Sequence, residues 1–551
     1  MRILQWLLVS AVLPWHIARA VEGGLEAPDR ATKLSRGSDG QKDLPSHSFW
    51  TSDDEPVPPI TNVLDSSSGN ATRNFVSATL HSHMVLQRDR KVILWGYSKK
   101  GAIVTTSLFD DDDSEETVAK ARLILSTTAD GDDGLWRQTL PPHAASLKAS
   151  RIQIKSTTGQ TQTLENVLFG DVYLCGGQSN MQFALPGNTN GTEEANKGNA
   201  YSHIRITTIG DRTSSSTPLP DLQTVDHQWS KADNHTLYGG GIFGHFSSVC
   251  WFFAKEVADA LGNKVPIGLI SNNWGGTKIE QWLPKGNLYN AMINPYMVGP
   301  MAVTGFTWYQ GESNAGSTES SKAYSHQFPE MIQAWRDGFK QPDAYFGFVQ
   351  LSTWCPPTPE AVPLLRQSQM AALKLNNVGY STNADMGAGC NIHPPPKQFC
   401  GYRLGKSALA IQYGHPIHWK SPSYSKAKST VDRKHKKKPK GKPSVVVQFQ
   451  DISSSGLYLL KTPYNAQVKD FSCKGKPAGT CAGAAVLLNG KGWVDASISI
   501  KSNTTVTLTA STGDSRKDSI VATSYGWGSV PMMTIYDKAT DLPVLPWNEK
   551  I

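Results

Sequence analysis

The predicted fold is organised around residues 170–181, which read Gly170-Asp171-Val172-Tyr173-Leu174-Cys175-Gly176-Gly177-Gln178-Ser179-Asn180-Met181. An apolar run ends at two glycines, and a serine flanked by amide side chains follows at once. A strand that stops at a glycine turn can raise a serine hydroxyl to the rim of a sheet, where a small ester can reach it. A polar turn after a core strand has the same pattern. Residues 170–181 alone therefore leave both interpretations open.

Apolar strands alternate with amphipathic helices beyond residue 167. This alternation predicts an α/β fold with a mostly parallel sheet and helices on both faces. Ligands of such sheets bind at the carboxyl ends of the strands, and three polar, glycine-containing turns follow directly on predicted strands. Besides the strand that enters the Ser179 turn, we expect strands at 265–270, 302–309, 345–351 and 378–382, and helices at 247–261, 328–339, 364–375 and 398–412.

Two β-rich segments flank this region. Short alternating runs between Gly, Asp and Ser turns predict an antiparallel N-terminal β module, and the same patterning returns near the end of the chain. A stretch rich in Gly, Ser, Asp and Pro near the N-terminus predicts a flexible lead. We expect a signal peptide at 1–20, the lead at 21–74, a β module at 75–165, an α/β domain at 166–418, a basic loop at 419–444 and a second β module at 445–551.

The first twenty residues have the features of a secretory signal peptide. Arg2 precedes a largely apolar run at 3–17, and Ala18-Arg19-Ala20 fits a cleavage site. A membrane anchor is the competing interpretation, but the run is shorter than the roughly 20 residues that a spanning helix needs. No later segment is long enough, so we expect a secreted or lysosomal protein without a transmembrane segment. Four N-glycosylation sequons, at Asn70, Asn190, Asn234 and Asn503, agree with entry into the secretory pathway.

Seven cysteines in 551 residues do not make a disulfide scaffold. Their odd number leaves at least one thiol unpaired unless two chains are bridged. We expect Cys473 to pair with Cys481, because the two lie close together in a loop rich in Gly and Lys. We expect Cys175, just before the glycine turn, to be the free thiol.

The formal net charge of +8 is confined to one segment. Residues 420–442 contain ten Lys and Arg against one Asp, a net charge of +9, so the remainder of the chain carries −1. The run at 434–443 lacks interleaved aromatic residues and apolar periodicity, which favours a solvated loop over a nucleic-acid-binding surface. A patch that contacts acidic glycans or the cell surface is the alternative.

The three polar turns and one histidine together contain the groups that ester hydrolysis requires. These groups are a nucleophile, a base and donors for the oxyanion. Ser179 is the candidate nucleophile. His393 is the candidate base, because the three prolines that follow it fix the backbone; an ordinary surface histidine is the competing interpretation. The oxyanion donors would be the backbone N–H of Ser179, one from the Gly275-Gly276 turn, and the side-chain amide of Gln310 or Asn314.

Four motifs in this order resemble the sialate O-acetylesterase family of SGNH-type hydrolases. They are Gly-Gln-Ser-Asn-Met at 177–181, Trp-Gly-Gly-Thr at 274–277, Trp-Tyr-Gln-Gly-Glu-Ser-Asn at 308–314, and Ile-His-Pro with Lys397 at 392–397. Met-Val-Leu-Gln-Arg at 84–88 and Trp-Gly at 95–96 extend the resemblance, which covers about residues 75–415. It implies an SGNH-like three-layer α/β domain between two β modules. It also implies removal of acetyl groups from sugar hydroxyls, typically of O-acetylated sialic acids, without a metal or organic cofactor.

The resemblance further implies a role for each motif residue. Ser179 would be the nucleophile and His393 the base that takes its proton. Gly276 and Gln310 would be oxyanion donors, and Glu312 and Asn314 would shape the loop around Gln310.

One position departs from the pattern of these hydrolases. They commonly place an aspartate three residues before the histidine, where this chain has Cys390. Asp385, eight residues before His393, is the candidate orienting acid, and a backbone carbonyl with a Ser–His dyad is the alternative. Arg366 lies in an Arg-x-x-Gln pattern and is a candidate contact for the sialic carboxylate. A salt bridge on the helix surface is the other interpretation of Arg366.

Two further functions stay open from the sequence. Related hydrolases share these motifs, so deacetylation of plant or microbial polysaccharides such as acetylated xylan is one alternative. A glycan-binding protein on the same scaffold, without catalysis, is the other. The presence of both Ser179 and His393 favours an enzyme.

Overall fold

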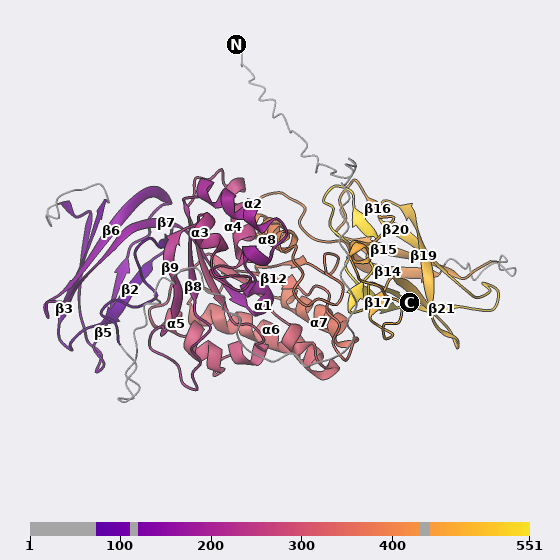
Figure 1. Ribbon diagram of the computed structural model, residues 1–551, viewed down its shortest axis with the longest axis horizontal. Coiled ribbons are helices and arrows are strands. Elements are labelled where there is room, and N and C mark those ends of the chain that lie inside the picture. The colour runs from indigo at the N-terminus through magenta and orange to yellow at the C-terminus, as the bar shows by residue number, and fades with distance from the viewer. Residues whose placement is uncertain (1–72, 111–119, 430–440) are drawn as a thin grey trace, which may run out of the picture. The chain divides into compact units, whose positions relative to one another are not determined.

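The computed structural model describes residues 73–110, 120–429 and 441–551 (Figure 1). The predicted signal peptide, the predicted lead up to residue 72, the sequon at Asn70 and most of the Lys-rich run at 434–443 lie outside these ranges. Among the described residues, no helix is both long enough and apolar enough to cross a membrane.

The central sheet is mostly parallel, as the alternation of strands and helices predicted. Seven of its strands follow the order β13-β12-β11-β7-β10-β8-β9, and the β8–β9 pair is the antiparallel one among these neighbours. Five of the seven are strongly apolar and buried, which suits strands covered on both faces. Their bounds are β7 (Thr161–Gly177), β8 (Ile204–Ile209), β9 (Val225–Lys231), β10 (Ile267–Asn273), β11 (Gly305–Tyr309), β12 (Tyr345–Gln350) and β13 (Val378–Thr382).

Helices cover both faces of this sheet. In Figure 1, α4 (Ser248–Ala260) and α8 (Gln398–Ile411) lie on one side, and α6 (Thr318–Gly338) and α7 (Ala361–Gln369) lie on the other. Helix α6 begins ten residues before the predicted start at 328 because the Ser317 hydroxyl accepts a hydrogen bond from the Ser320 N–H and caps its first turn. The shorter helices are α1 (Ser179–Gln182), α2 (Gly191–Lys197), α3 (Asn234–Tyr238) and α5 (Pro295–Val298).

Strand β7 is shared between the N-terminal β-rich segment and the central sheet. Its first half pairs antiparallel with β6 (Ser146–Ser156) and parallel with β1 (Val85–Gln87), and its second half pairs with β10 and β11. The boundary predicted at 165/166 therefore falls inside one strand. The remaining N-terminal strands are β2 (Val92–Tyr97), β3 (Ile103–Asp110), β4 (Leu123–Thr128) and β5 (Leu135–Leu140).

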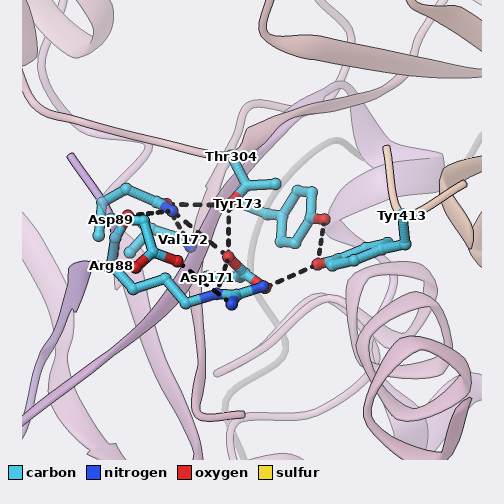
Figure 2. Close-up of polar contacts among 8 residues, drawn as sticks. Arg88, Asp89, Asp171, Val172, Tyr173, Thr304 and Tyr413 are labelled. Carbon is cyan, nitrogen blue, oxygen red and sulfur yellow. Dashed lines mark hydrogen bonds and ion pairs between the residues drawn. The ribbon is translucent and has the colours of Figure 1, made fainter. Parts of the chain in front are cut away.

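A buried carboxylate holds these two regions together where β7 enters the central sheet (Figure 2). Asp171 accepts hydrogen bonds from the guanidinium of Arg88 at 2.9 and 3.1 Å, from Thr304 at 3.0 Å and from the Tyr413 hydroxyl at 2.9 Å. Tyr413 in turn lies 2.8 Å from the Tyr173 hydroxyl. Gln87 also donates to Asp171, at 3.3 Å. The Gln-Arg pair that ends the motif at 84–88 thus connects the N-terminal strands to the sheet that carries the Ser179 turn.

The C-terminal strands form a second, antiparallel sheet with the order β14-β15-β20-β19-β18-β21-β24 and its own apolar core. Strand β14 lies inside the segment 419–444, which was predicted to be a loop, so the prediction was wrong for these residues. A strand with several lysines is possible here because β14 is at the edge of the sheet, where charged side chains remain solvated. The bounds are β14 (Ser423–Ser429), β15 (Ser444–Gln450), β16 (Leu457–Leu459), β17 (Cys481–Ala482), β18 (Ala484–Leu488), β19 (Gly492–Ser502), β20 (Thr505–Ala510), β21 (Ile520–Tyr525), β22 (Val530–Pro531), β23 (Ile535–Asp537) and β24 (Trp547–Lys550).

Three disulfides pair six of the seven cysteines. They are Cys175–Cys250, Cys355–Cys390 and Cys473–Cys481. The predicted Cys473–Cys481 pair is confirmed. The prediction that Cys175 is free was wrong, because its side chain on β7 meets Cys250 on the apolar stripe of α4. The free thiol is Cys400, which is buried in α8.

Candidate active site

The serine turn is built at the carboxyl end of β7. Gly177 has a φ of 149°, and a Cβ at this position would lie 2.3 Å from the carbonyl oxygen of Tyr309 on the neighbouring strand β11. The close approach requires a glycine, and the chain then enters α1 at Ser179. Ser179 is half-buried, so its hydroxyl reaches the rim of the sheet, as the nucleophile interpretation requires.

His393 lies against the serine although 214 residues separate them. Its Nε2 is 2.8 Å from the Ser179 Oγ. The imidazole stacks on Phe183 and meets Phe243 edge-on, with ring centroids 6.3 and 5.1 Å away. Burial, together with the positive charge of Lys397, lowers the pKa of His393 to about 4. The imidazole is therefore neutral at neutral pH and can accept the hydroxyl proton.

The candidate orienting acid, Asp385, is engaged elsewhere. Both of its carboxylate oxygens accept hydrogen bonds from Arg403, at 2.8 and 2.9 Å, and one also accepts from the Tyr536 hydroxyl at 3.2 Å. Among the described residues, the contact with Ser179 is the one hydrogen bond made by the His393 ring. The prediction for Asp385 was wrong, because a buried carboxylate pairs with the nearest guanidinium.

The Gly275-Gly276 turn lies beside the nucleophile. A Cβ on Gly275 would be 3.4 Å from the Cβ of Ser179, and the Gly275 N–H donates to the Gln182 side chain at 3.0 Å. Gly276 is exposed with a φ of 74°. Within the described residues, neither the Gly276 N–H nor the Ser179 N–H makes a hydrogen bond, so both are free to donate to an oxyanion.

Gln310 is not placed to be an oxyanion donor, which corrects the prediction. Its side chain is fully buried, and its amide nitrogen lies 3.0 Å from the Thr277 carbonyl, 2.8 Å from Asn314 Oδ1 and 3.2 Å from Gln178 Oε1. Asn314 is also buried, and its amide donates to Glu280 at 3.0 Å. Both amides therefore hold the loops around the site together instead of facing a substrate.

Two buried residues without an assigned role in the sequence contact the segments that carry Ser179 and His393. Asn180 is fully buried, and its amide nitrogen donates to Glu312 and to the carbonyl of Ile392. Lys397 is also fully buried, and its ammonium donates to Asn180 Oδ1 and to the carbonyl of Pro394. Both belong to motifs quoted above, but a linear motif does not show which groups its amide and ammonium contact.

Burial shifts the pKa values of the acidic and basic groups in this cluster in opposite directions. It raises the pKa of the Glu312 carboxyl and lowers the pKa of the Lys397 ammonium to about 8. One oxygen of Glu312 accepts from Asn180, whereas the other is buried without a hydrogen-bond partner among the described residues. Glu312 is therefore a buried carboxyl group that contacts the residue directly after Ser179.

Arg366 is not available to a substrate carboxylate, and it makes no salt bridge with any residue that the structure describes. Its side chain is 2% exposed and donates to the carbonyls of Leu351 and Ser352 at 2.7 and 2.6 Å. It also donates to the carbonyls of Gly528 and Ser529, at 2.7 and 3.0 Å. The guanidinium thus joins α7 to the C-terminal β-rich segment.

Three of the four predicted N-glycosylation sites lie within the described residues, and Asn190, Asn234 and Asn503 are all exposed. Asn234 is the first residue of α3 and lies between Asp233 and Thr236, which exchange hydrogen bonds as a capping box.

Comparison with known proteins agrees with this geometry. Residues 169–394 match the family model described as carbohydrate esterase, sialic acid-specific acetylesterase. The chain is 32% identical over 408 residues to human sialate O-acetylesterase, an alignment that spans 65% of this chain and 74% of the human one. It is 31% identical over 412 residues to the rat enzyme of the same name, across 61% and 73% of the two chains.

A solved structure is similar over nearly the whole described length. A carbohydrate acetylesterase from Xanthomonas citri superposes with a TM-score of 0.69 at 27% identity, covering 87% of this chain and 99% of the bacterial one. The chain described here belongs to the sialate O-acetylesterase family of carbohydrate esterases.

Proposed function

We propose that this esterase removes O-acetyl groups from sialic acids, with Ser179 as nucleophile and His393 as general base. The observation that carries the proposal is the 2.8 Å contact between Ser179 Oγ and His393 Nε2 at the carboxyl end of β7. The free N–H groups of Ser179 and Gly276 next to this contact are the proposed oxyanion donors. Gln310, Glu312 and Asn314 are proposed to hold that arrangement in place.

The reaction takes place in two steps. Ser179 Oγ attacks the acetyl carbonyl while His393 Nε2 accepts the hydroxyl proton, and the oxyanion of the tetrahedral intermediate accepts from the two backbone donors. The carbon–oxygen bond to the sugar then breaks, and His393 gives its proton to the leaving sugar oxygen. A water molecule, deprotonated by His393, attacks the acetyl-enzyme. Collapse of the second intermediate releases acetate, and the proton returns to Ser179.

The choice of sialic acid as substrate rests on the names of the relatives, since the mammalian proteins are called sialate O-acetylesterases. The Xanthomonas citri relative is described as a carbohydrate acetylesterase, which leaves acetylated xylan as the second candidate. Because Arg366 is buried against carbonyl groups, we expect residues other than Arg366 to contact a sialic carboxylate. A purely glycan-binding protein would not need the Ser179–His393 contact.

The test is acetate release from a panel of O-acetyl sialosides and acetylated xylans. We expect release from the sialosides and none from the Ser179→Ala variant. Ser325→Ala is the matched control and should retain full activity, because Ser325 is exposed on α6 and its hydroxyl donates to the Lys322 carbonyl. Release from xylan alone would reassign the substrate, and hydrolysis of nothing by the wild-type protein would refute the esterase mechanism.

The SGNH-type architecture and the oxyanion assignment are proposed together. They are supported by the mostly parallel sheet, with Ser179 and His393 both at its carboxyl end. A crystal structure of the protein after reaction with a phosphonate would test them, because a phosphonyl oxygen on Ser179 stands in for the oxyanion. We expect that oxygen within hydrogen-bond distance of the Ser179 and Gly276 N–H groups. Contact with the Gln310 amide instead would overturn the assignment.

We also propose that the chain enters the secretory pathway through residues 1–20 and is secreted or lysosomal. Three disulfides are typical of proteins that fold in an oxidising compartment, and three of the sequons are exposed. Expression in a secreting eukaryotic host should yield a protein that loses mass on treatment with an N-glycosidase. Retention of the first twenty residues in an unglycosylated product would contradict the proposal.

The basic segment is proposed to contact acidic glycans. Lys426 and Lys428 on β14 and Lys501 on β19 line one groove of about 360 Å³ on the C-terminal sheet. Three lysines that line one groove favour an anionic ligand. Heparin retention should fall when the three are changed together to Gln, whereas changing the exposed Lys285, Lys322 and Lys340 together should leave it unaltered. Equal retention of both triple variants would remove this proposal.

A further inference from the structure

The structure leaves His393 without a carboxylate partner among the described residues, although a general base needs a fixed orientation. The residue at the position of the usual acid, Cys390, is bonded to Cys355. Something else must therefore hold the imidazole against Ser179. The groups in contact with the histidine loop supply a candidate.

We infer that Asn180 and Lys397 act as a pair of positioning residues that clamp the backbone on both sides of His393. The Asn180 amide donates to the carbonyl of Ile392 at 2.8 Å, and the Lys397 ammonium donates to the carbonyl of Pro394 at 2.9 Å. The two side chains are also bonded to each other, through Asn180 Oδ1 and Lys397 Nζ. This inference deepens the proposed hydrolytic function and rests on it.

Asn180 connects the clamp to the nucleophile as well as to the base. It follows Ser179 directly in the chain and lies in the same short helix, α1. The Glu312 carboxylate accepts from its amide nitrogen and so fixes the orientation of the amide. Asn180 therefore links the helix that carries Ser179 to the loop that carries His393.

Lys397 is fully buried, which is costly for an ammonium group unless its N–H donors are satisfied. Besides its two hydrogen bonds, the ammonium lies 4.5 Å from the ring centroid of Phe183 and 5.7 Å from that of Tyr309. Cation–π contacts of this kind favour the charged ammonium. Phe183 also stacks on His393, so one aromatic ring contacts both the clamp and the base.

The clamp has an electrostatic consequence for the base. The positive charge of Lys397 lowers the pKa of His393, in addition to the larger effect of burial. The other titratable groups near Lys397 are the Tyr309 ring, the Cys400 thiol and Glu312, and the last two raise the pKa of Lys397 against the larger effect of burial. Removing the charge should therefore raise the pKa of His393, while removing the hydrogen bonds should loosen the His393 loop.

Lys397→Met removes both the charge and the hydrogen bonds at similar side-chain length. We expect kcat on an O-acetyl sialoside to fall about 100-fold with KM little changed, because misplacement of a catalytic group costs on that order. We also expect the acid limb of the kcat/KM profile to move to higher pH. Lys406→Met is the matched control on α8, since Lys406 is exposed and paired with Glu256. An unchanged kcat and an unchanged acid limb in Lys397→Met would overturn the inference.

Lys397→Gln keeps N–H donors without the charge, and it carries the test if the Met variant does not fold. Its acid limb should move as far as that of Lys397→Met, with a smaller loss of kcat. A folded Gln variant with the wild-type acid limb would equally overturn the inference. Thermal unfolding of each variant establishes which of them are folded.

A second measurement separates failure of the clamp from failure of the proposed function. Labelling by a fluorophosphonate requires a reactive Ser179 but no acetylated sugar. Its rate should fall in Lys397→Met and stay unchanged in Lys406→Met, whatever the natural substrate is. If the wild-type protein is labelled but releases no acetate, the substrate assignment fails and the clamp stands. Equal labelling of the folded Lys397 variants and the wild type would remove the clamp alone.

Discussion

At the residue scale, the proposed general base, His393, has unusual neighbours. Two aromatic rings and a buried ammonium group lie close to it, and the described residues place no carboxylate within hydrogen-bond distance of its ring. An orienting acid would raise the basicity of the imidazole, whereas these neighbours reduce it. The pH range over which the base works should therefore extend further into acid than that of an ordinary histidine.

The acid limb of kcat/KM for the wild-type protein should lie near pH 4. Only neutral imidazole accepts the serine proton, and burial with the charge of Lys397 lowers the pKa of His393 to about 4. Activity should stay level from about pH 5 to 7 and fall about tenfold for each pH unit below 4. A pH profile on a sialoside, with folding checked at each pH, measures this. A limb near 6.5, the ordinary histidine value, would contradict it.

The turn before the serine should not tolerate a side chain. Gly177→Ala would place a Cβ 2.3 Å from the Tyr309 carbonyl oxygen, so β7 and β11 must separate or the turn must move. We expect at least a 100-fold loss of kcat from a displaced Ser179, and about 2 kcal/mol of lost stability. Gly316→Ala is the control, since nothing lies within 4 Å of its added Cβ. Enzyme kinetics and denaturant unfolding of both variants check the prediction.

At the scale of single elements, the histidine loop has a covalent attachment as well as the clamp. Cys355, after β12, is bonded to Cys390, three residues before His393. The bond fixes the start of the loop against the carboxyl end of the sheet. The disulfide therefore involves the position at which related hydrolases commonly have an aspartate. It constrains the loop by a covalent bond, whereas an aspartate would orient the histidine by a hydrogen bond.

Removing this bond should impair catalysis more than removing the bond in the C-terminal segment. The Cys355→Ser/Cys390→Ser double variant should lose about 4 kcal/mol of stability by loop entropy and at least tenfold in kcat. The Cys473→Ser/Cys481→Ser variant, which opens a loop of 8 residues, should lose about 2.5 kcal/mol and keep its kcat. Unfolding curves and steady-state kinetics at a temperature where both are folded make the comparison. Equal kcat values would show that this bond does not position the base.

The sequence predicted some elements well and others not at all. Strand β13 coincides with the predicted 378–382 run because its apolar pattern is local. Strand β9, Val225–Lys231, was missed because its polar sequence becomes a strand only by pairing with β8. Ser179 and His393 were identified from motifs, whereas the roles of Asn180 and Arg366 depend on groups that only the folded chain brings to them.

At the scale of the whole molecule, the α/β region and the C-terminal strands share a buried cation. The guanidinium of Arg366 on α7 donates to two carbonyls of its own region and to those of Gly528 and Ser529. Burial lowers the pKa of Arg366 to about 9, and these four acceptors compensate for the lost water. The C-terminal segment therefore completes the interior beside the site.

Arg366→Met should affect stability without affecting substrate recognition. It leaves four buried carbonyls without their donor, which should cost about 4 kcal/mol in total. The KM for an O-acetyl sialoside, relative to that for a neutral acetyl ester, should stay at the wild-type ratio. Arg516→Met, an exposed C-terminal arginine paired with Asp514, is the control for both measurements. A selective rise in KM for the sialoside would instead place Arg366 at the substrate carboxylate.

The same guanidinium makes folding depend on the order of synthesis. Gly528 and Ser529 lie 162 and 163 residues after Arg366, so at about 5 to 20 residues per second they leave the ribosome roughly 10 to 30 s later. Until then, two of the carbonyl groups that accept from Arg366 have not been synthesised. Burying the Arg366 guanidinium before that point would leave some of its N–H donors without acceptors. The α/β region should therefore reach its full stability only after the segment that contains Gly528 and Ser529 has been synthesised.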